Sequence, residues 1–89
     1  MRIIYTNQFK RDYKRVQNQN KDVEKLKLVI DRLAGKKKLD PRYRDHPLSG
    51  NWKGFRDCHI ESDWVLIYKA TEDALVLERT GSHSELFKQ

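Results

Sequence analysis

Titratable and aromatic side chains gather between residues 45 and 69 of the sequence. This stretch holds two of the three histidines, both tryptophans, the only cysteine and three aspartates. Imidazole and carboxylate groups can exchange protons near neutral pH without help from a metal. The candidates for such chemistry, here and toward the C-terminus, are His46, Asp57, His59, Asp63 and His83, with Arg56 and Arg79 as cations.

These residue types fit the cleavage of RNA. Without a metal, that reaction needs a base for the 2′-hydroxyl proton, a cation for the charged phosphorane and an acid for the leaving 5′-oxygen. Asp57 and His59 are two residues apart, so on a strand they share a face, where the carboxylate can orient the imidazole. A single histidine would indicate a surface residue. Three histidines with interleaved carboxylates give the catalytic interpretation equal standing.

Other kinds of site are not indicated. Cys58 and His59 are neighbours on an expected strand, so their side chains point to opposite faces and are poorly placed to share one metal ion. The sequence contains no glycine-rich phosphate loop, serine nucleophile elbow or cysteine nucleophile motif. We therefore expect no metal site and no nucleotide cofactor.

The net charge of +6 is unevenly distributed. Residues 1–50 contain 14 Lys and Arg against 6 Asp and Glu, a net charge of +8, whereas residues 51–89 contain 5 against 7, a net charge of −2. This division is typical of a protein that holds a polyanion with one half and acts on it with the other. The alternative is a basic face that serves solubility alone.

The first half predicts a strand followed by two helices. Residues 2–5 form a β-branched and aromatic run, and Thr6 or Asn7 can cap the helix that follows. The stripe Phe9, Tyr13 and Val16 marks its buried side. The remaining circumference carries the cations expected to bind RNA, which are Lys10, Arg11, Lys14 and Arg15.

The second helix is expected from Asp22 to Ala34, with Gly35 in the left-handed conformation that often ends a helix. Residues 39–47 are interpreted as a loop. Three strands are expected at residues 52–60, 63–70 and 74–80, with Leu75, Leu77 and Arg79 on one face of the last. Ser82 and Glu85 have capping-box spacing. The expected fold is α+β with the order β-α-α-β-β-β, a helical hairpin packed on one face of a mostly antiparallel sheet, in a single domain spanning residues 1–89.

The sequence resembles the YafQ-type toxins of the RelE superfamily nearly from end to end. The resemblance rests on Asp45-His46-Pro47-Leu48-Ser49-Gly50-Asn51-Trp52-Lys53-Gly54-Phe55-Arg56-Asp57, on His59 and Asp63-Trp64-Val65-Leu66-Ile67-Tyr68-Lys69, and on Glu78-Arg79-Thr80-Gly81-Ser82-His83 with Leu86-Phe87. It is looser in the two helices, where mainly the lysine-rich character matches.

The resemblance implies a RelE-like fold and a bacterial type II toxin, an endoribonuclease that cuts mRNA in the A site of the 70S ribosome and is neutralised by a cognate antitoxin. It places functional positions at His46, Asp57, His59, Asp63, His83 and Phe87, and a phosphate-contacting arginine at Arg79. By chemistry we assign His83 as general acid or base. His59, braced by Asp57 or Asp63, takes the complementary role, while His46 and Arg79 hold the phosphate. In an alternative assignment, His46 exchanges roles with His59 or His83.

Two other functions remain open at this point. A gyrase-targeting toxin of the same superfamily would lack this histidine set, and a non-catalytic basic RNA-binding module would not need it. Phe55, Tyr68 and Phe87 are candidates for stacking on a base, and Phe87 is the best of them because residues so near a terminus rarely belong to a core. The sequence contains no apolar run of membrane-spanning length and no signal peptide, and a single cysteine fits a reducing compartment, so we expect a soluble, cytoplasmic protein without a membrane partner.

Overall fold

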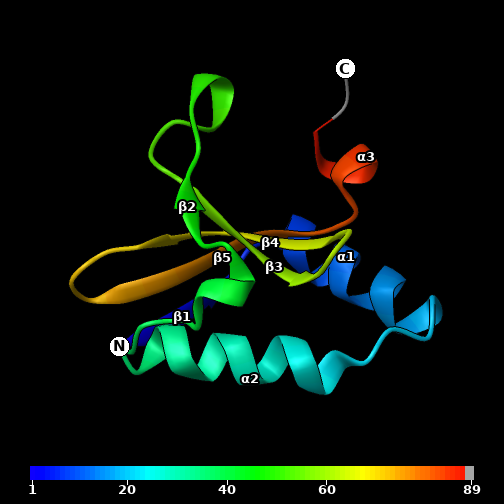
Figure 1. Cartoon of the computed structure of the whole chain (residues 1–89), viewed down its shortest axis with the longest axis horizontal. Coiled ribbons are helices and arrows are strands. Elements are labelled where there is room, and N and C mark those ends of the chain that lie inside the picture. Colours follow the sequence, from blue (N-terminus) through cyan, green and yellow to red (C-terminus); the bar gives the residue numbers. More distant parts are fainter. Residues whose placement is uncertain (88–89) are drawn as a thin grey trace.

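The computed structural model describes residues 1–87 and has α+β architecture (Figure 1). Its strands are β1 (Arg2–Tyr5), β2 (His46–Pro47), β3 (Arg56–Glu61), β4 (Trp64–Ala70) and β5 (Ala74–Gly81). Its helices are α1 (Asn7–Asn18), α2 (Val23–Ala34) and the short α3 (His83–Leu86), and two single 3₁₀ turns are η1 (Pro41–Tyr43) and η2 (Gly50–Trp52). No helix within residues 1–87 is long and apolar enough to cross a membrane.

The five strands form one sheet in the order β1-β5-β4-β3-β2. Strands β2 to β5 pair antiparallel, because short loops between successive strands favour antiparallel pairing. Strand β1 pairs parallel with β5. The first strand of the chain therefore lies beside the last one, with Arg2 opposite Ala74 and Tyr5 opposite Leu77. This pairing joins the two ends of the sequence.

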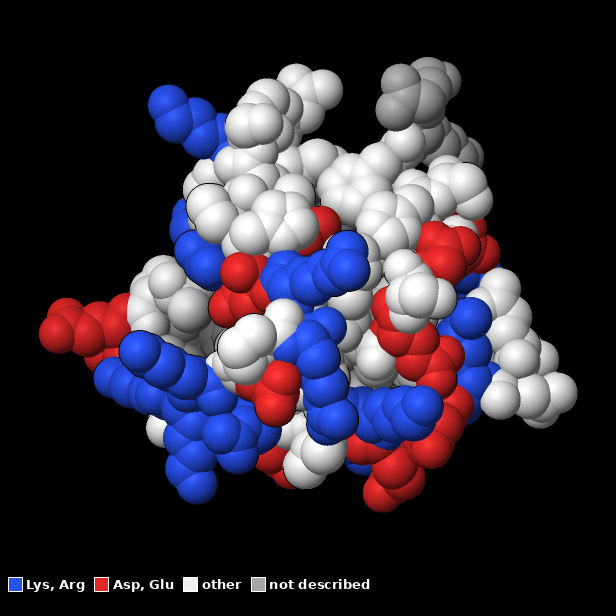
Figure 2. All heavy atoms as spheres, in the orientation of Figure 1, with Lys and Arg blue, Asp and Glu red and all other residues white. Residues whose placement is uncertain are grey.

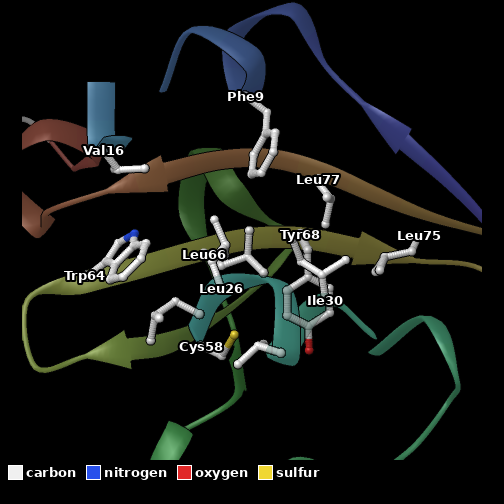
Figure 3. Packing of buried hydrophobic residues seen from close by; sticks show 12 residues of the cluster. Phe9, Val16, Leu26, Ile30, Cys58, Trp64, Leu66, Tyr68, Leu75 and Leu77 are labelled. Carbon is white, nitrogen blue, oxygen red and sulfur yellow. The ribbon is translucent and has the colours of Figure 1, made fainter. Parts of the chain in front are cut away.

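Helices α1 and α2 cover one face of the sheet and bury the main core there (Figure 3). Thr6 caps α1 by accepting a hydrogen bond from the Phe9 amide, and Asp22 caps α2 in the same way through the Glu24 amide. The largest buried side chain is Trp64, whose indole N–H donates to Thr80 Oγ1 at 2.9 Å. The expected helical hairpin on one face is confirmed.

The other face of the sheet is more open and carries a smaller apolar cluster. Val65 and Ile67 of β4 are fully buried there beneath Leu86 of α3. Partly buried side chains complete this cluster, namely Leu48, Trp52, Phe55 and Phe87. We call this the histidine face, because the candidate catalytic residues lie on it.

Three local predictions are wrong. Trp52 lies in η2 and the strand begins only at Arg56, while His46 and Pro47 form a short strand that the loop interpretation missed. The left-handed residue after α2 is Lys36, at φ 58°, and Gly35 keeps φ −82°. Helix α2 needs no glycine there, because a lysine one residue later makes the turn.

The last strand also departs from simple alternation. Leu77 pairs with Tyr68 whereas Arg79 pairs with Ile67, so the register shifts by one residue between them. Residues paired across strands share a face, and Ile67 and Tyr68 point to opposite faces. Arg79 therefore lies on the opposite face from Leu77, contrary to the sequence prediction, and this irregularity is a β-bulge.

Candidate active site on the histidine face

Register brings the candidate residues into two rows across the histidine face. In the first row His46 pairs with Asp57, Asp57 with Ile67, and Ile67 with Arg79. Neighbouring strands are about 4.8 Å apart, so this row runs from an imidazole at the β2 edge to a guanidinium on β5. The second row joins His59 to Val65 and Gly81, just before α3 begins. The sheet thus places histidines from β2, β3 and α3 on one surface.

His83 at the start of α3 is oriented by Asp63 in the β3–β4 turn. Asp63 Oδ1 lies 2.7 Å from His83 Nδ1 and also accepts the His83 backbone N–H at 3.0 Å. These two hydrogen bonds lower the pKa of Asp63 below its ordinary value, so the carboxylate is ionised and acts only as an acceptor. Nδ1 must then carry a proton, which leaves Nε2 as the nitrogen free for chemistry.

His46 has the same tautomer for a different reason. Its Nδ1 forms a 2.8 Å hydrogen bond with the Arg44 carbonyl oxygen, which can only accept, and lies 3.1 Å from Asp57 Oδ1. The proton therefore resides on Nδ1, and Nε2 is again the free nitrogen. The side chains of His46 and His83 are 52% and 44% exposed, so both free nitrogens are open to a substrate.

Asp57 is the buried carboxylate of the cluster. It is 3% exposed, and Oδ1 accepts no well-aligned hydrogen bond from the described residues. Burial raises the pKa of Asp57, and the charges of His46, His59 and His83 act in the opposite direction. All three imidazoles are therefore near enough to interact with the Asp57 carboxylate. An ionised Asp57 stabilises whichever imidazole becomes protonated.

His59 is not braced as the sequence predicted. Asp63 binds His83 and Asp57 lies against His46, and neither carboxylate forms a hydrogen bond with the His59 ring among the described contacts. His59 instead lies against His83, with ring centroids 5.0 Å apart. We call His46, His59, His83, Asp57 and Asp63 the histidine cluster.

Phe87 connects the cluster to the apolar part of this face. Its ring centroid lies 6.1 Å from that of His83 and 6.4 Å from that of Trp52. Phe87 is thus half-buried against the smaller core, contrary to the argument that a residue so near the C-terminus stays out of a core. The Phe87 ring nevertheless lies beside His83, a candidate catalytic residue.

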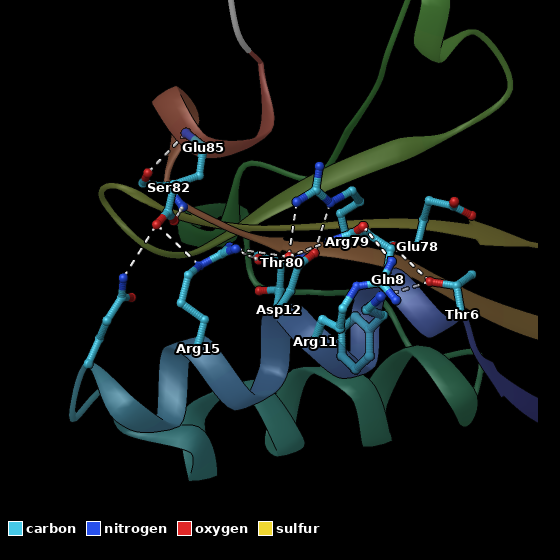
Figure 4. Close-up of polar contacts among 12 residues, drawn as sticks. Thr6, Gln8, Arg11, Asp12, Arg15, Glu78, Arg79, Thr80, Ser82 and Glu85 are labelled. Atoms are coloured by element: carbon cyan, nitrogen blue, oxygen red, sulfur yellow. Dashed lines mark hydrogen bonds and ion pairs between the residues drawn. The ribbon is translucent and has the colours of Figure 1, made fainter.

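Arg79 is held by a residue that the sequence analysis missed. Asp12 of α1 is fully buried and accepts hydrogen bonds from Arg79 Nε at 2.8 Å and Nη2 at 2.9 Å (Figure 4). Burial alone would raise the pKa of Asp12, but hydrogen bonds from Arg79, Gln8 and the Thr80 amide outweigh it and lower the pKa. A signal existed, since Asp12 shares the buried side of α1 with Phe9 and Val16.

Arg15 links the same carboxylate to α3. Its Nη1 lies 3.1 Å from Asp12 Oδ1, its Nε lies 3.2 Å from Glu85 Oε2, and its Nη2 donates to the Thr80 carbonyl (Figure 4). Glu85 in turn accepts the Ser82 amide, which completes the predicted capping box. We call Asp12, Arg15, Arg79 and Glu85 the α1–α3 clasp, because they tie the helix that bears His83 to the body of the protein.

The predicted RNA-binding cations fall into three groups. Arg15 is occupied within the clasp, while Lys10, Arg11 and Lys14 are exposed on α1. Arg56 pairs with Tyr68 in the sheet and so points to the helical face, where its Nε donates to Asp45 at 3.1 Å. Arg56 therefore does not join the histidine cluster. On the face shown in Figure 2, Lys and Arg gather along α2 and the connection after it.

Known proteins match this chain over nearly its whole length. Residues 1–88 match the family described as bacterial toxin of type II toxin–antitoxin system, YafQ. The mRNA interferase toxin YafQ of Escherichia coli K12 is 48% identical over 86 residues, which cover 96% of this chain and 94% of the relative. The crystal structure of YafQ from E. coli BL21(DE3) superposes with a TM-score of 0.94 at 46% identity, over 98% of this chain and 99% of that one.

A solved complex is also similar. The E. coli DinJ–YafQ structure contains a chain that matches 98% of this protein, with 99% of that chain covered, at 47% identity and a TM-score of 0.90. The fold expected from the sequence, including its RelE-like character, agrees with these structures. The chain belongs to the YafQ family of bacterial toxins of type II toxin–antitoxin systems.

Proposed function

We propose that this toxin is an endoribonuclease that cuts mRNA in the ribosomal A site by metal-independent acid–base catalysis. The observation that carries the proposal is the pair of histidines whose Nδ1 atoms are held by acceptors, so that both Nε2 atoms are free on one open face. Relatives that are 48% identical are named mRNA interferases, which supports the same activity here.

His83 is assigned as one proton-transfer group. Asp63 accepts hydrogen bonds from the ring Nδ1 and from the backbone N–H of His83, whose ring also lies beside Phe87. An ionised carboxylate on Nδ1 stabilises the imidazolium that forms when Nε2 takes a proton. His59 is assigned the complementary role, because its ring centroid is 5.0 Å from that of His83. Two adjacent imidazoles can serve the attacking and leaving oxygens of one phosphate.

His46 and Arg79 are assigned to the phosphate. They end the row that crosses the sheet through Asp57 and Ile67, and a phosphate near the centre of that row has a cation or imidazole on either side. Two nitrogens of Arg79 are bound to Asp12, which leaves Nη1 to contact the substrate.

The ribosome is the proposed platform for the substrate. The histidine face is open, and the side chains of His46 and His83 are about half exposed. Such an open site suits an mRNA that the ribosome holds in place. The exposed cations of α1 supply contacts to ribosomal RNA, since phosphate contacts position a protein without reading sequence. A cognate antitoxin neutralises the toxin, as the DinJ–YafQ complex supports.

The chemistry is tested on 70S ribosomes programmed with a defined mRNA. We expect cleavage products with a 2′,3′-cyclic phosphate or 3′-phosphate and a free 5′-hydroxyl, because the nucleophile is the substrate's own 2′-hydroxyl. A single 2′-deoxyribose at the cut site should stop cleavage while ribosome binding persists. The same mRNA without ribosomes is the control and should remain intact.

Products with 5′-phosphate ends, or cleavage at the 2′-deoxy position, would contradict the mechanism and point to activated water. Chelation is the second control. Rates measured with ribosomes kept intact by magnesium, with and without a chelator specific for transition metals, should agree, because the assigned groups are imidazoles and a guanidinium.

A further inference from the structure

A cavity of about 600 Å³ opens beside the histidine cluster, along the outer edge of β3. Its wall includes His59 of the cluster together with Arg42, Tyr43 and Arg44 from η1 and the residue after it. Lys25 and Leu28 of α2 close the far side. This volume lies within the range of small-molecule binding sites, about 300–1,000 Å³.

The edge of β3 that borders the cavity has free hydrogen-bonding groups. Strand β2 pairs only with Arg56 and Asp57, so within residues 1–87 no strand covers β3 beyond that point. The Leu48 amide donates to the Phe55 carbonyl, which shows that Phe55 directs its backbone groups to this side. Alternation then turns the backbone N–H and C=O of His59 the same way, into the cavity.

A flat cation forms another part of the wall. The Arg42 guanidinium lies over the Tyr43 ring, with its carbon 5.0 Å from the ring centroid, and its Nη2 donates to the Tyr43 hydroxyl at 3.1 Å. Arg42 is an exposed residue. Arginine planes held in this way are surfaces on which unpaired RNA bases stack.

The same segment is tied to the catalytic residues. Arg44 adopts a left-handed conformation, at φ 50°, and its carbonyl oxygen is the acceptor 2.8 Å from His46 Nδ1. A ligand in the cavity would therefore touch the segment that fixes His46 and the backbone of His59. The cavity therefore adjoins the proposed reaction centre in two ways. His59 lines its wall, and Arg44 in the same wall forms a hydrogen bond with His46.

The charge of the wall favours RNA over an acidic protein segment. Lys25 is already paired with Glu61 at 2.8 Å, which leaves Arg42 and Arg44 as the cations without a carboxylate partner among the described contacts. The Arg42 guanidinium lies over an aromatic ring, and Arg44 lines the same cavity as His59. Stacking together with free backbone donors and acceptors can recognise a base, whereas a carboxylate needs only charge.

We propose that this cavity binds the mRNA nucleotide adjacent to the scissile phosphate. Its base stacks on the Arg42 plane, its edge meets the His59 backbone, and Arg44 contacts its phosphate. The cavity is then the subsite through which the toxin prefers one base at that position. This inference rests on the proposed cleavage of mRNA.

Arg42→Lys is the test variant, because it keeps the positive charge and removes the plane. On ribosomes programmed with mRNAs that differ at each nucleotide flanking the cut, we expect cleavage to slow roughly five- to tenfold and the base preference at one flanking position to weaken. Arg2→Lys, on the exposed β1 edge, is the matched control and should match the wild type. Thermal unfolding of both variants verifies the fold.

A second measurement reports binding without cleavage. An mRNA with 2′-deoxyribose at the cut carries the fluorescent base 2-aminopurine at each flanking position in turn. The wild-type toxin should quench the fluorescence at one of these positions, whereas Arg42→Lys should not. Unchanged rates, preference and fluorescence in Arg42→Lys, with an active wild type, overturn the subsite. Loss of antitoxin binding alone assigns the cavity to a protein partner and also overturns it. A wild type that does not cut mRNA refutes the proposed function instead.

Discussion

The two buried aspartates, Asp12 and Asp57, differ in their hydrogen bonding and in the direction of their pKa shifts. Asp12 is fully buried in the α1–α3 clasp, where two arginines and a backbone amide satisfy it and its pKa falls. Asp57 is nearly as buried in the histidine cluster, yet Oδ1 lacks a well-aligned donor and its pKa rises. The first arrangement stabilises the fold. The second leaves an incompletely paired carboxylate beside the imidazoles that we propose carry out proton transfer.

The largest effect on activity with little effect on stability is expected for His83, in the histidine cluster. Replacing it by alanine removes a proton-transfer group and should slow cleavage by about 100-fold or more. The free energy of unfolding should change by no more than about 0.5 kcal/mol, because the side chain is half exposed and the hydrogen bond from its backbone to Asp63 remains. Single-turnover cleavage and urea unfolding measure the two effects, with Ser84→Ala as control. A variant that cuts normally would remove His83 from the mechanism.

Asp12→Asn should show the reverse pattern in stability. It leaves Arg79 and Arg15 without their shared carboxylate and should lower the free energy of unfolding by about 2 kcal/mol, less than for a fully buried pair because Arg79 keeps 22% side-chain exposure. The exposed Asp31→Asn is the control. Because the folded-state pKa of Asp12 is lowered, its contribution is present above the unfolded pKa and is lost as pH falls through the folded one. The variant should therefore lose less stability in acid than the wild type.

Asp57→Asn should instead raise the stability of the protein and slow its cleavage of mRNA. Its raised pKa means that ionisation opposes folding, and this cost is present above the folded-state pKa and disappears as pH falls through it. Well above the folded-state pKa of Asp57, the amide should raise the free energy of unfolding by about 1 kcal/mol, because it removes a buried charge. Cleavage should slow by about tenfold or more, because a neutral amide does not stabilise an imidazolium. A less stable Asp57→Asn variant would erase the contrast with Asp12.

The smallest effects are expected on the outer side of α1. Neutralising Lys10, Arg11 and Lys14 to glutamine should leave unfolding unchanged and reduce the salt dependence of ribosome binding by a slope of about 2–3. Arg15→Gln, one residue further along the helix, should cost stability instead because it breaks the clasp. Binding measured over a series of salt concentrations separates the two groups. An unchanged slope in the triple variant would make the outer surface a solubility face.

Local signals in the sequence identified what local interactions decide. Thr6, Asp22 and the Ser82–Glu85 box cap their helices as predicted, since each cap bonds to an amide two or three residues away. The structure brings the predicted residues of the histidine cluster together on one face, where alternation along β3 had placed Asp57 with His59. Whether each plays its assigned role remains a prediction.

Long-range geometry was beyond those signals. The bulge that moves Arg79 to the histidine face arises from the register between β4 and β5, and a face prediction from alternation alone fails there. The partners of Asp63 and Asp57 likewise depend on where α3 and β2 come to rest. The position of Asp12 on the buried side of α1 was a local signal, but its partners Arg79 and Thr80 lie 67 and 68 residues away.

The parallel pairing of β1 with β5 has a consequence for synthesis. Strand β1 and Asp12 leave the ribosome early, but their partners, from Ala74 to Thr80, emerge only when the chain is nearly finished. Contacts of such long sequence separation close late in folding. A nascent chain that ends before β5 contains neither Arg79 nor His83, so on the proposed mechanism we expect an incomplete chain to be unable to cut mRNA.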